Sequence, residues 1–141
     1  MALRRIIVCG SRDWGVANPR HEESAVKRAL QECACIHDFL SWYRYLHVQG
    51  IEIITGDGTG ADQVGKRWAI SNGIEHRSFP AKWDLYGRAA GPIRNREMAI
   101  YGADDCVAFW DGESTGTKSM IGLARDHGIP VTIQRINEVG A

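Results

Sequence analysis

The chain has 141 residues, the size of one domain with a single hydrophobic core, and its 17 basic and 17 acidic residues give a formal net charge of zero. A neutral chain has no overall attraction for nucleic acid or an anionic membrane, which leaves only a local basic patch open. No apolar run reaches the roughly 18 residues of a membrane span, and the start, MALRRIIVCG, lacks the apolar core and cleavage site of a signal peptide. We therefore expect one cytoplasmic domain over residues 1–141 with no membrane partner.

Short apolar runs rich in β-branched residues recur between helical segments. They cover residues 4–9, 51–55, 74–79, 106–110 and 130–133. Their hydrophobicity is continuous rather than alternating, as expected when helices cover both faces of a parallel sheet. This order predicts an α/β fold: a single Rossmann-like open parallel sheet of about five strands with right-handed crossovers and helices on both faces.

The first connection, about residues 21–48, is long and is predicted to hold one extended helix or two. Its apolar residues fit one face of a helix as far as Leu40, but the aromatic segment that follows, SWYRYLH, exceeds what one core-facing stripe can bury. Either a longer helix packs on the sheet, or this surface mediates self-association, because exposed aromatic patches often mark contacts. The segment favours a homo-oligomer.

Three further helices are predicted at about residues 61–72, 92–101 and 117–127. Each is followed directly by a glycine (Gly73, Gly102 and Gly128), the residue that most often ends a helix in the left-handed conformation.

Cysteine and histidine give no sign of a metal site. Cys9 and Cys106 lie inside apolar runs, Cys33 and Cys35 are too close together for a standard zinc pair, and the five histidines show no ligand spacing. We expect four reduced thiols, no metal and no other cofactor. His76 alternates with apolar neighbours in the third strand and is expected to face solvent.

Glycine and small polar residues follow three of the strands, as GSRDWG at 10–15, GDGTGAD at 56–62 and DGESTGT at 111–117. The carboxyl ends of parallel strands form the crevice where ligands bind, and helix N-termini there present free N–H groups to anions. Tight turns would explain any one of these loops, but three on one edge favour a phosphate-binding crevice. Neither a Walker A loop nor a GxGxxG fingerprint occurs. The third loop is the strongest phosphate candidate, and we expect no room for a side chain at Gly116.

The stretch FPAKWDLYGRAAGPIRNREM combines basic and aromatic residues between the third strand and its helix. Arg94 is a candidate to form bidentate hydrogen bonds with a phosphate. Asn95 is a candidate to hydrogen-bond a base edge or a sugar hydroxyl, and Trp83 is a candidate to stack on a base. The alternative is a solvated loop and an ordinary capped helix. Trp14 and Trp110 also border the crevice, where they would stack on a base or wedge the loops apart.

Together these motifs resemble the SLOG superfamily, and most closely its YspA-like branch of small bacterial and phage-borne Rossmann-like proteins. That branch has a GSR-D-W start, a G-x-x-x-GAD loop and an AGP-x-RN-x-x-M segment, and here the fourth strand is followed by GESTGT. The resemblance covers nearly the whole chain apart from residues 35–47. It implies a sheet ordered 3-2-1-4-5, and the superfamily's habit of self-association also favours a homo-oligomer.

The resemblance further implies which residues contact a ligand. These are Gly10, Ser11 and Arg12 on one side, Thr115, Gly116 and Thr117 around a phosphate on the other, Gly56, Gly60, Ala61 and Asp62 as a third wall, and Arg94 with Asn95 to complete the site.

The LOG-type phosphoribohydrolases of this superfamily cleave the N-glycosidic bond of nucleoside monophosphates with a GGxGTxxE segment whose glutamate belongs to the active site. Met120 stands at that position here, and Gly112-Glu113 replaces the double glycine. The chain thus keeps the phosphate-binding half of the motif and lacks its carboxylate. Hydrolysis would need another carboxylate near the crevice, for which the candidates are Asp13, Asp57, Asp62, Asp84, Asp111 and Glu113.

Three functions are therefore compared. The first is a module that senses or sequesters a nucleotide-derived small molecule, such as a mononucleotide or an ADP-ribose-like compound, and the missing glutamate favours it. The second is an N-glycosidic or phosphoribosyl hydrolase with Asp62 or Asp13 as the carboxylate and Arg94 as the anion clamp. The third is single-stranded DNA binding, as in DprA-like members, through Arg88, Arg94 and Arg96, against which the zero net charge argues.

Overall fold

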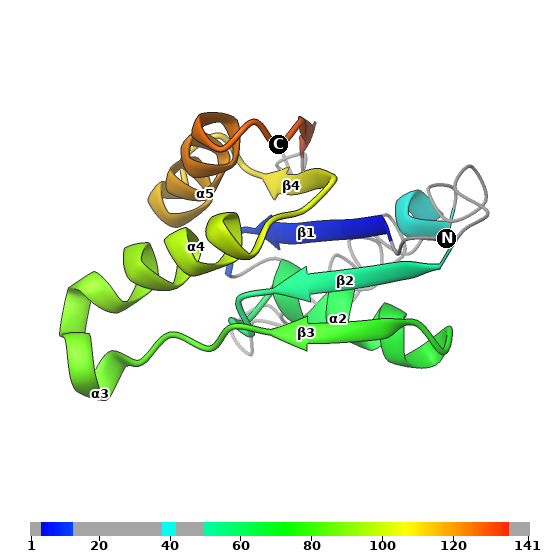
Figure 1. Ribbon diagram of the computed structural model, residues 1–141, viewed down its shortest axis with the longest axis horizontal. Coiled ribbons are helices and arrows are strands. Elements are labelled where there is room, and N and C mark those ends of the chain that lie inside the picture. Colours follow the sequence, from blue (N-terminus) through cyan, green and yellow to red (C-terminus); the bar gives the residue numbers. More distant parts are fainter. Residues whose placement is uncertain (1–3, 13–37, 42–49, 136–141) are drawn as a thin grey trace, which may run out of the picture.

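The computed structural model describes residues 4–12, 38–41 and 50–135. Five strands form one parallel sheet in the order β3-β2-β1-β4-β5 (Figure 1): β1 (Arg4–Gly10), β2 (Ile51–Thr55), β3 (Glu75–Ser78), β4 (Asp105–Trp110) and β5 (Val131–Arg135). The predicted fold class and strand order are confirmed. Because the chain winds outward in both directions from β1, the boundary between β1 and β4 is the point where a ligand crevice opens.

The helices are α2 (Ala61–Ser71), α3 (Trp83–Tyr86), α4 (Ala90–Tyr101) and α5 (Thr115–Asp126), with a 3-10 turn, η1 (Gly87–Ala89), between α3 and α4. The glycines predicted to follow the three longer helices all have positive φ, so these helix ends are confirmed. Helices α4 and α5 begin two residues earlier than predicted. The short α3 was not predicted, and Figure 1 places it beyond the carboxyl ends of the strands.

Two apolar clusters cover the two faces of the sheet. Residues Ile6 and Val8 of β1 face the cluster that holds α2 and Leu40, whereas Ile7 and Cys9 face the cluster that holds α4 and α5. Successive strand residues therefore enter opposite clusters, which explains the continuous hydrophobicity of the central strands. Cys9 and Cys106 are buried free thiols, as predicted, and Cys33 and Cys35 lie outside the described residues.

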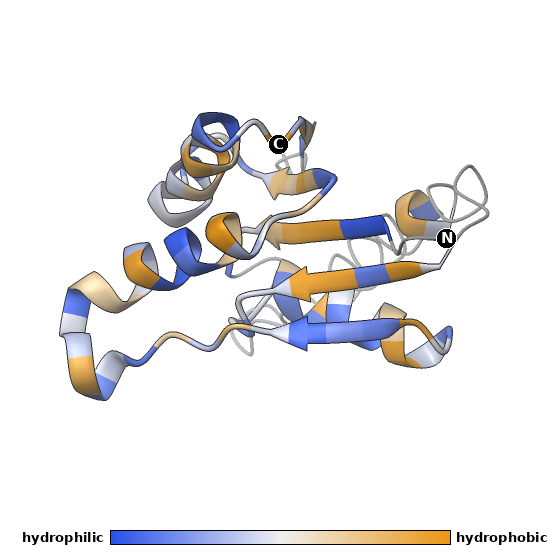
Figure 2. Ribbon diagram, viewed as in Figure 1, coloured by the Kyte–Doolittle hydropathy of each residue, from blue (hydrophilic) through white to orange (hydrophobic). Residues whose placement is uncertain are grey.

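The edge strand β3 departs from the sequence prediction. The apolar residues Ile74 and Phe79 flank the strand, and its own residues, EHRS, are hydrophilic (Figure 2). The expectation that His76 faces solvent is wrong: it is half-buried, and its Nε2 lies 2.9 Å from Thr55 Oγ1. Burial, with Lys66 nearby, lowers the pKa of His76.

A polar cluster fixes the end of α4 against the sheet. The Tyr101 hydroxyl donates to Glu52 Oε1 at 2.8 Å, and Glu52 is 5% exposed. The guanidinium carbons of Arg5 and Arg77 lie 4.7 and 5.0 Å from the centre of the Tyr101 ring, and both arginines pair with Glu52. This cluster sets the position of α4 and of the site residues that it carries.

Only a short part of the predicted connection at 21–48 is described. Residues 38–41 are helical, Leu40 is buried, and Ser41 Oγ accepts the Trp68 indole N–H at 3.2 Å. Asp13, Trp14 and the aromatic segment at 42–47 lie outside the described residues. Within the described ranges, no helix has the length and apolar character needed to cross a membrane.

Candidate functional site

A cavity of about 610 Å³ lies at the carboxyl ends of β1 and β4, within the size range of small-molecule sites. The end of β1, the start of α2, α3, α4 and the start of α5 all contribute to its wall. The predicted ligand residues that line it are Gly10, Ser11, Arg12, Asp62, Trp83, Arg94, Asn95, Thr115, Gly116 and Thr117, and Arg88 also lines it. The fold therefore brings together residues from four separate motifs, and their contact with a ligand stays a prediction.

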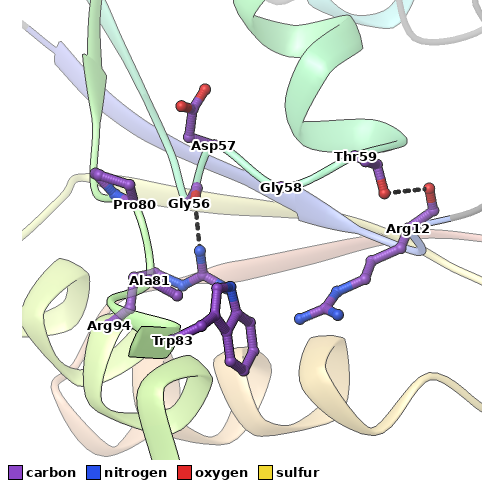
Figure 3. A pocket seen from close by; sticks show the side chains of 9 residues that line it. All are labelled: Arg12, Gly56, Asp57, Gly58, Thr59, Pro80, Ala81, Trp83 and Arg94. Carbon is purple, nitrogen blue, oxygen red and sulfur yellow. Dashed lines mark hydrogen bonds between the residues drawn. The ribbon is translucent and has the colours of Figure 1, made fainter. Parts of the chain in front are cut away.

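A smaller lobe of about 360 Å³ adjoins this cavity and is drawn in Figure 3. Arg12, Gly58, Trp83 and Arg94 line both spaces. Gly56 lines the smaller lobe but not the larger cavity. Gly60 and Ala61 line neither space: a Cβ atom at Gly60 would overlap the carbonyl oxygens of Ser11 and Arg12, so this part of the predicted third wall packs against the end of β1.

The loop before α5 is ordered by its own side chains. Asp111 Oδ1 accepts the N–H groups of Glu113 and Ser114, both at 2.8 Å. The Ser114 hydroxyl lies 3.1 Å from Ser11 Oγ across the cavity mouth, and the Trp110 indole N–H donates to the Ser114 carbonyl at 3.1 Å. Trp110 therefore braces this loop. Burial would raise the pKa of Asp111, but the hydrogen bonds from Ser114 and Glu113 outweigh it and lower the pKa.

The N-terminus of α5 presents free donors to the cavity. The first intrahelical bond runs from the Lys118 N–H to the Ser114 carbonyl at 3.1 Å, so the amides of Thr115, Gly116 and Thr117 come before it. The first turn of α5 has no acidic residue and no side-chain cap. These amides and the positive end of the helix dipole are the kind of groups that bind an anion, and they lie at the cavity wall.

The N-terminus of α2 faces the same edge but is already occupied. Its first turn contains Asp62, whose Oδ2 accepts the Gly58 N–H at 3.0 Å, and the Ala61 N–H donates to the Ser11 carbonyl at 3.4 Å. A carboxylate in the first turn satisfies the helix dipole and repels a second anion. The first turn of α5 has no acidic residue, and the Asp111 carboxylate before it is held by the amides of Glu113 and Ser114, so α5 is the better suited of the two helices to hold a phosphate.

The expectation that Gly116 leaves no room for a side chain is wrong. Because α5 begins at Thr115, Gly116 belongs to the first helical turn rather than to a loop. A Cβ atom there would meet no protein atom within 4 Å. Since Gly116 lines the cavity, the open space beside it is where a ligand would approach the helix.

Arg94 and Asn95 connect three parts of the site. Arg94 Nη1 donates to the carbonyl oxygens of Gly56 and Phe79, its Nε donates to Asn95 Oδ1 at 2.9 Å, and Asn95 Nδ2 donates to the Gly116 carbonyl at 3.4 Å. Much of the hydrogen-bonding capacity predicted for the ligand thus holds β2, β3, α4 and α5 together. The Arg94 Nη2 group has no partner among the described residues. Burial lowers the pKa of Arg94, opposed by the charge of Asp62.

Two carboxylates of the described residues line the cavity, Asp62 and Asp111, and only Asp62 has a raised pKa. It is 9% exposed, and burial raises its pKa to about 6, opposed by the Gly58 hydrogen bond and by Arg94. Met120, at the position of the missing glutamate, is 1% exposed and packs in the core beside the cavity. Asp57 points away from Trp83 and Arg94 (Figure 3), toward Lys66 Nζ at 3.2 Å.

Two features of the site were not predicted from the sequence. The guanidinium carbon of Arg12 lies over the Trp83 ring, 5.2 Å from its centre, although the two residues lie far apart in the chain. The Asp111 bonds to Ser114 follow a local Asp-x-x-Ser pattern that could have been found. Within the described part of the chain, no three His, Cys, Asp or Glu side chains gather as a metal site would require.

Three comparisons place the chain among known proteins. Residues 4–86 match the model of a family described as "YspA, cpYpsA-related SLOG family". The chain is 31% identical over 136 residues to the gene 61 protein of Mycobacterium phage D29, a match that covers 92% of this chain and 94% of the phage protein. The X-ray structure of TM1055 matches with a TM-score of 0.61 and 17% identity, covering 92% of this chain and 72% of that one. This last likeness concerns the fold alone.

Proposed function

The chain belongs to the YspA, cpYpsA-related SLOG family of nucleotide-related Rossmann-like proteins, and on that premise we propose that it binds a nucleotide-derived small molecule at the cavity between β1 and β4. The observation that carries the proposal is the uncapped N-terminus of α5, with the amides of Thr115, Gly116 and Thr117 at the cavity wall. Three backbone donors and a helix dipole are suited to a phosphate group.

The role that we propose is sensing or sequestering the ligand rather than cleaving it. A carboxylate at position 120 would stand beside the phosphate subsite, but the residue there is Met120, an apolar side chain that borders the cavity from the core. One observation favours hydrolysis of an N-glycosidic bond as a second candidate: Asp62 lines the same cavity, and its pKa of about 6 suits proton transfer near neutral pH.

Native mass spectrometry distinguishes these functions. The full chain is mixed with nucleoside monophosphates, nucleoside diphosphates, ADP-ribose and NAD, and spectra are recorded at once and after prolonged incubation. We expect one nucleotide to be retained intact. Conversion of a ligand to free base and sugar phosphate would identify a hydrolase. If no ligand of the panel binds and the chain instead binds single-stranded DNA in a salt-sensitive way, the proposal is contradicted. The same spectra report the mass of the predicted homo-oligomer.

Replacing Gly116 with leucine tests the phosphate subsite. The side chain would enter the open space beside the first turn of α5, so we expect nucleotide affinity to fall at least about tenfold, or about 1.4 kcal/mol. Stability should not fall, because leucine has a higher helix propensity than glycine. Calorimetric titration measures the affinity and urea denaturation the stability.

Gly122→Leu is the matched control for this variant. Gly122 lies in the same helix, and a Cβ atom there also meets nothing within 4 Å, but Gly122 does not line the cavity. Its nucleotide affinity should equal that of the wild type. Equal affinity of the Gly116→Leu and Gly122→Leu proteins would place the ligand away from the start of α5.

A further inference from the structure

Two arginines stand between the cavity and its smaller lobe without a carboxylate partner. Arg12 and Arg94 line both spaces. The ion pairs of the described residues join Arg4 to Asp105, Arg5 and Arg77 to Glu52, and Lys66 to Asp57, so Asp57, which lines the smaller lobe, is paired with Lys66 rather than with Arg12 or Arg94. Two positive charges therefore meet at the junction of the two spaces. The Asp62 carboxylate in the same cavity acts on Arg94 through its charge, but no acidic side chain of the described residues forms an ion pair with either arginine.

Arg12 is held in a way that leaves its donors available. Its guanidinium carbon lies 5.2 Å from the centre of the Trp83 ring (Figure 3). Its main chain is fixed, because the Thr59 hydroxyl donates to the Arg12 carbonyl at 2.9 Å. A cation–π contact forms no hydrogen bond with the ring, so the guanidinium N–H groups stay available to bind an oxyanion.

Arg94 is held from the opposite side of the lobe. Its Nη1 and Nε groups are engaged by Gly56, Phe79 and Asn95, which orients the guanidinium and leaves Nη2 as a donor. Burial lowers the pKa of Arg94, the charge of Asp62 raises it, and the charge of Arg12 lowers it, so the two cations disfavour each other although Asp62 offsets part of the effect. An anion between them would remove this repulsion and form charge-assisted hydrogen bonds with both.

We propose that the smaller lobe is a second anion subsite, in which Arg12 and Arg94 bind one phosphoryl group while the start of α5 binds another. The inference rests on the proposed function and narrows its ligand class. The ligand is then a nucleotide with at least two phosphoryl groups, such as a nucleoside diphosphate or a sugar ester of one, rather than a mononucleotide. The Trp83 indole forms one wall of this subsite and keeps Arg12 in place.

Calorimetric titration with matched ligand pairs tests the second subsite. The full chain is titrated with each of the four ribonucleoside 5′-monophosphates, with the corresponding 5′-diphosphates, and with ADP-ribose. For the base that binds best, we expect the diphosphate to bind about 10- to 100-fold more tightly than the monophosphate, the range for charged hydrogen bonds made by one partner only. In the Arg12→Gln variant this preference should fall to about threefold or less, because the guanidinium, with its paired N–H donors and its positive charge, is lost.

Arg125→Gln is the control for overall charge. Arg125 is exposed in the last turn of α5 and does not line either space, so its loss removes one positive charge without touching the subsite, and the preference should stay as in the wild type. Equal affinities for monophosphate and diphosphate in the wild type would overturn the second subsite and leave the proposed function standing. A preference that survives Arg12→Gln would overturn the assignment to Arg12, and the absence of any nucleotide binding would overturn the proposed function itself.

Discussion

Replacing Gly60 with alanine is expected to lower the free energy of unfolding by about 3 to 4 kcal/mol, combining a positive φ that disfavours a side chain with a steric overlap. Gly60 has a φ of 71°, and a Cβ atom there would overlap the carbonyl oxygens of Ser11 and Arg12. These atoms belong to main chain, so a side-chain rotation cannot relieve the overlap. Urea denaturation of the wild type and the variant measures the loss.

Gly73→Ala separates the two causes. Gly73 has a similar φ of 64°, but a Cβ atom there meets nothing within 4 Å. Its replacement should cost about 1 to 2 kcal/mol, from the backbone conformation alone. Equal losses at the two positions would contradict the close approach between the start of α2 and the end of β1. A larger loss at Gly60 would show that this glycine holds the Ser11–Arg12 segment at the cavity edge.

The fold was largely predictable because its signals are local. Continuous apolar runs such as residues 51–55 predict strands buried on both faces, and a glycine after each longer helix marks its end. The strand order came from the family resemblance, since local patterns carry no information about which strands are neighbours. The early start of α5 was missed, because Asp111 orders the turn from outside the helix.

The candidate site was predictable in its loops and less so in its contacts. Parallel strands bring their carboxyl ends to one edge, so the residues after β1 and β4 could be grouped from the order of the strands alone. What could not be predicted is how each polar group is satisfied. Arg94 donates to carbonyl groups after β2 and β3, and the Arg12 guanidinium lies over the Trp83 ring. These contacts depend on packing between segments that are distant in the chain.

Replacing Asp62 with asparagine is expected to stabilise the protein at pH 7.5 by about 2 to 3 kcal/mol, because each pKa unit corresponds to about 1.4 kcal/mol. Burial raises the folded pKa of Asp62 from 3.8 to about 6, so the fold favours the protonated form. The stability that protonation contributes is fully present below pH 3.8 and is lost as the pH rises through about 6. Asparagine stays neutral, and its side-chain oxygen can still accept the Gly58 N–H.

The pH dependence gives this prediction a second readout. Urea denaturation between pH 4 and 7.5 should show the wild type losing stability across pH 4 to 6, with a shallower slope in Asp62→Asn. Asp126→Asn, an exposed site in the last turn of α5, should keep the wild-type slope. Equal slopes in the wild type and Asp62→Asn would show that Asp62 ionises freely in the fold.

A carboxylate that lowers the stability of the fold at neutral pH is expected to contribute to function. Asp62 satisfies only the Gly58 amide within the described residues, a bond that asparagine could replace. We therefore expect Asp62→Asn to trade function for stability, with ligand affinity or turnover falling as the free energy of unfolding rises. If the variant becomes more stable and both ligand affinity and turnover are unchanged, Asp62 has no part in the site, and hydrolysis loses the carboxylate that made it a candidate.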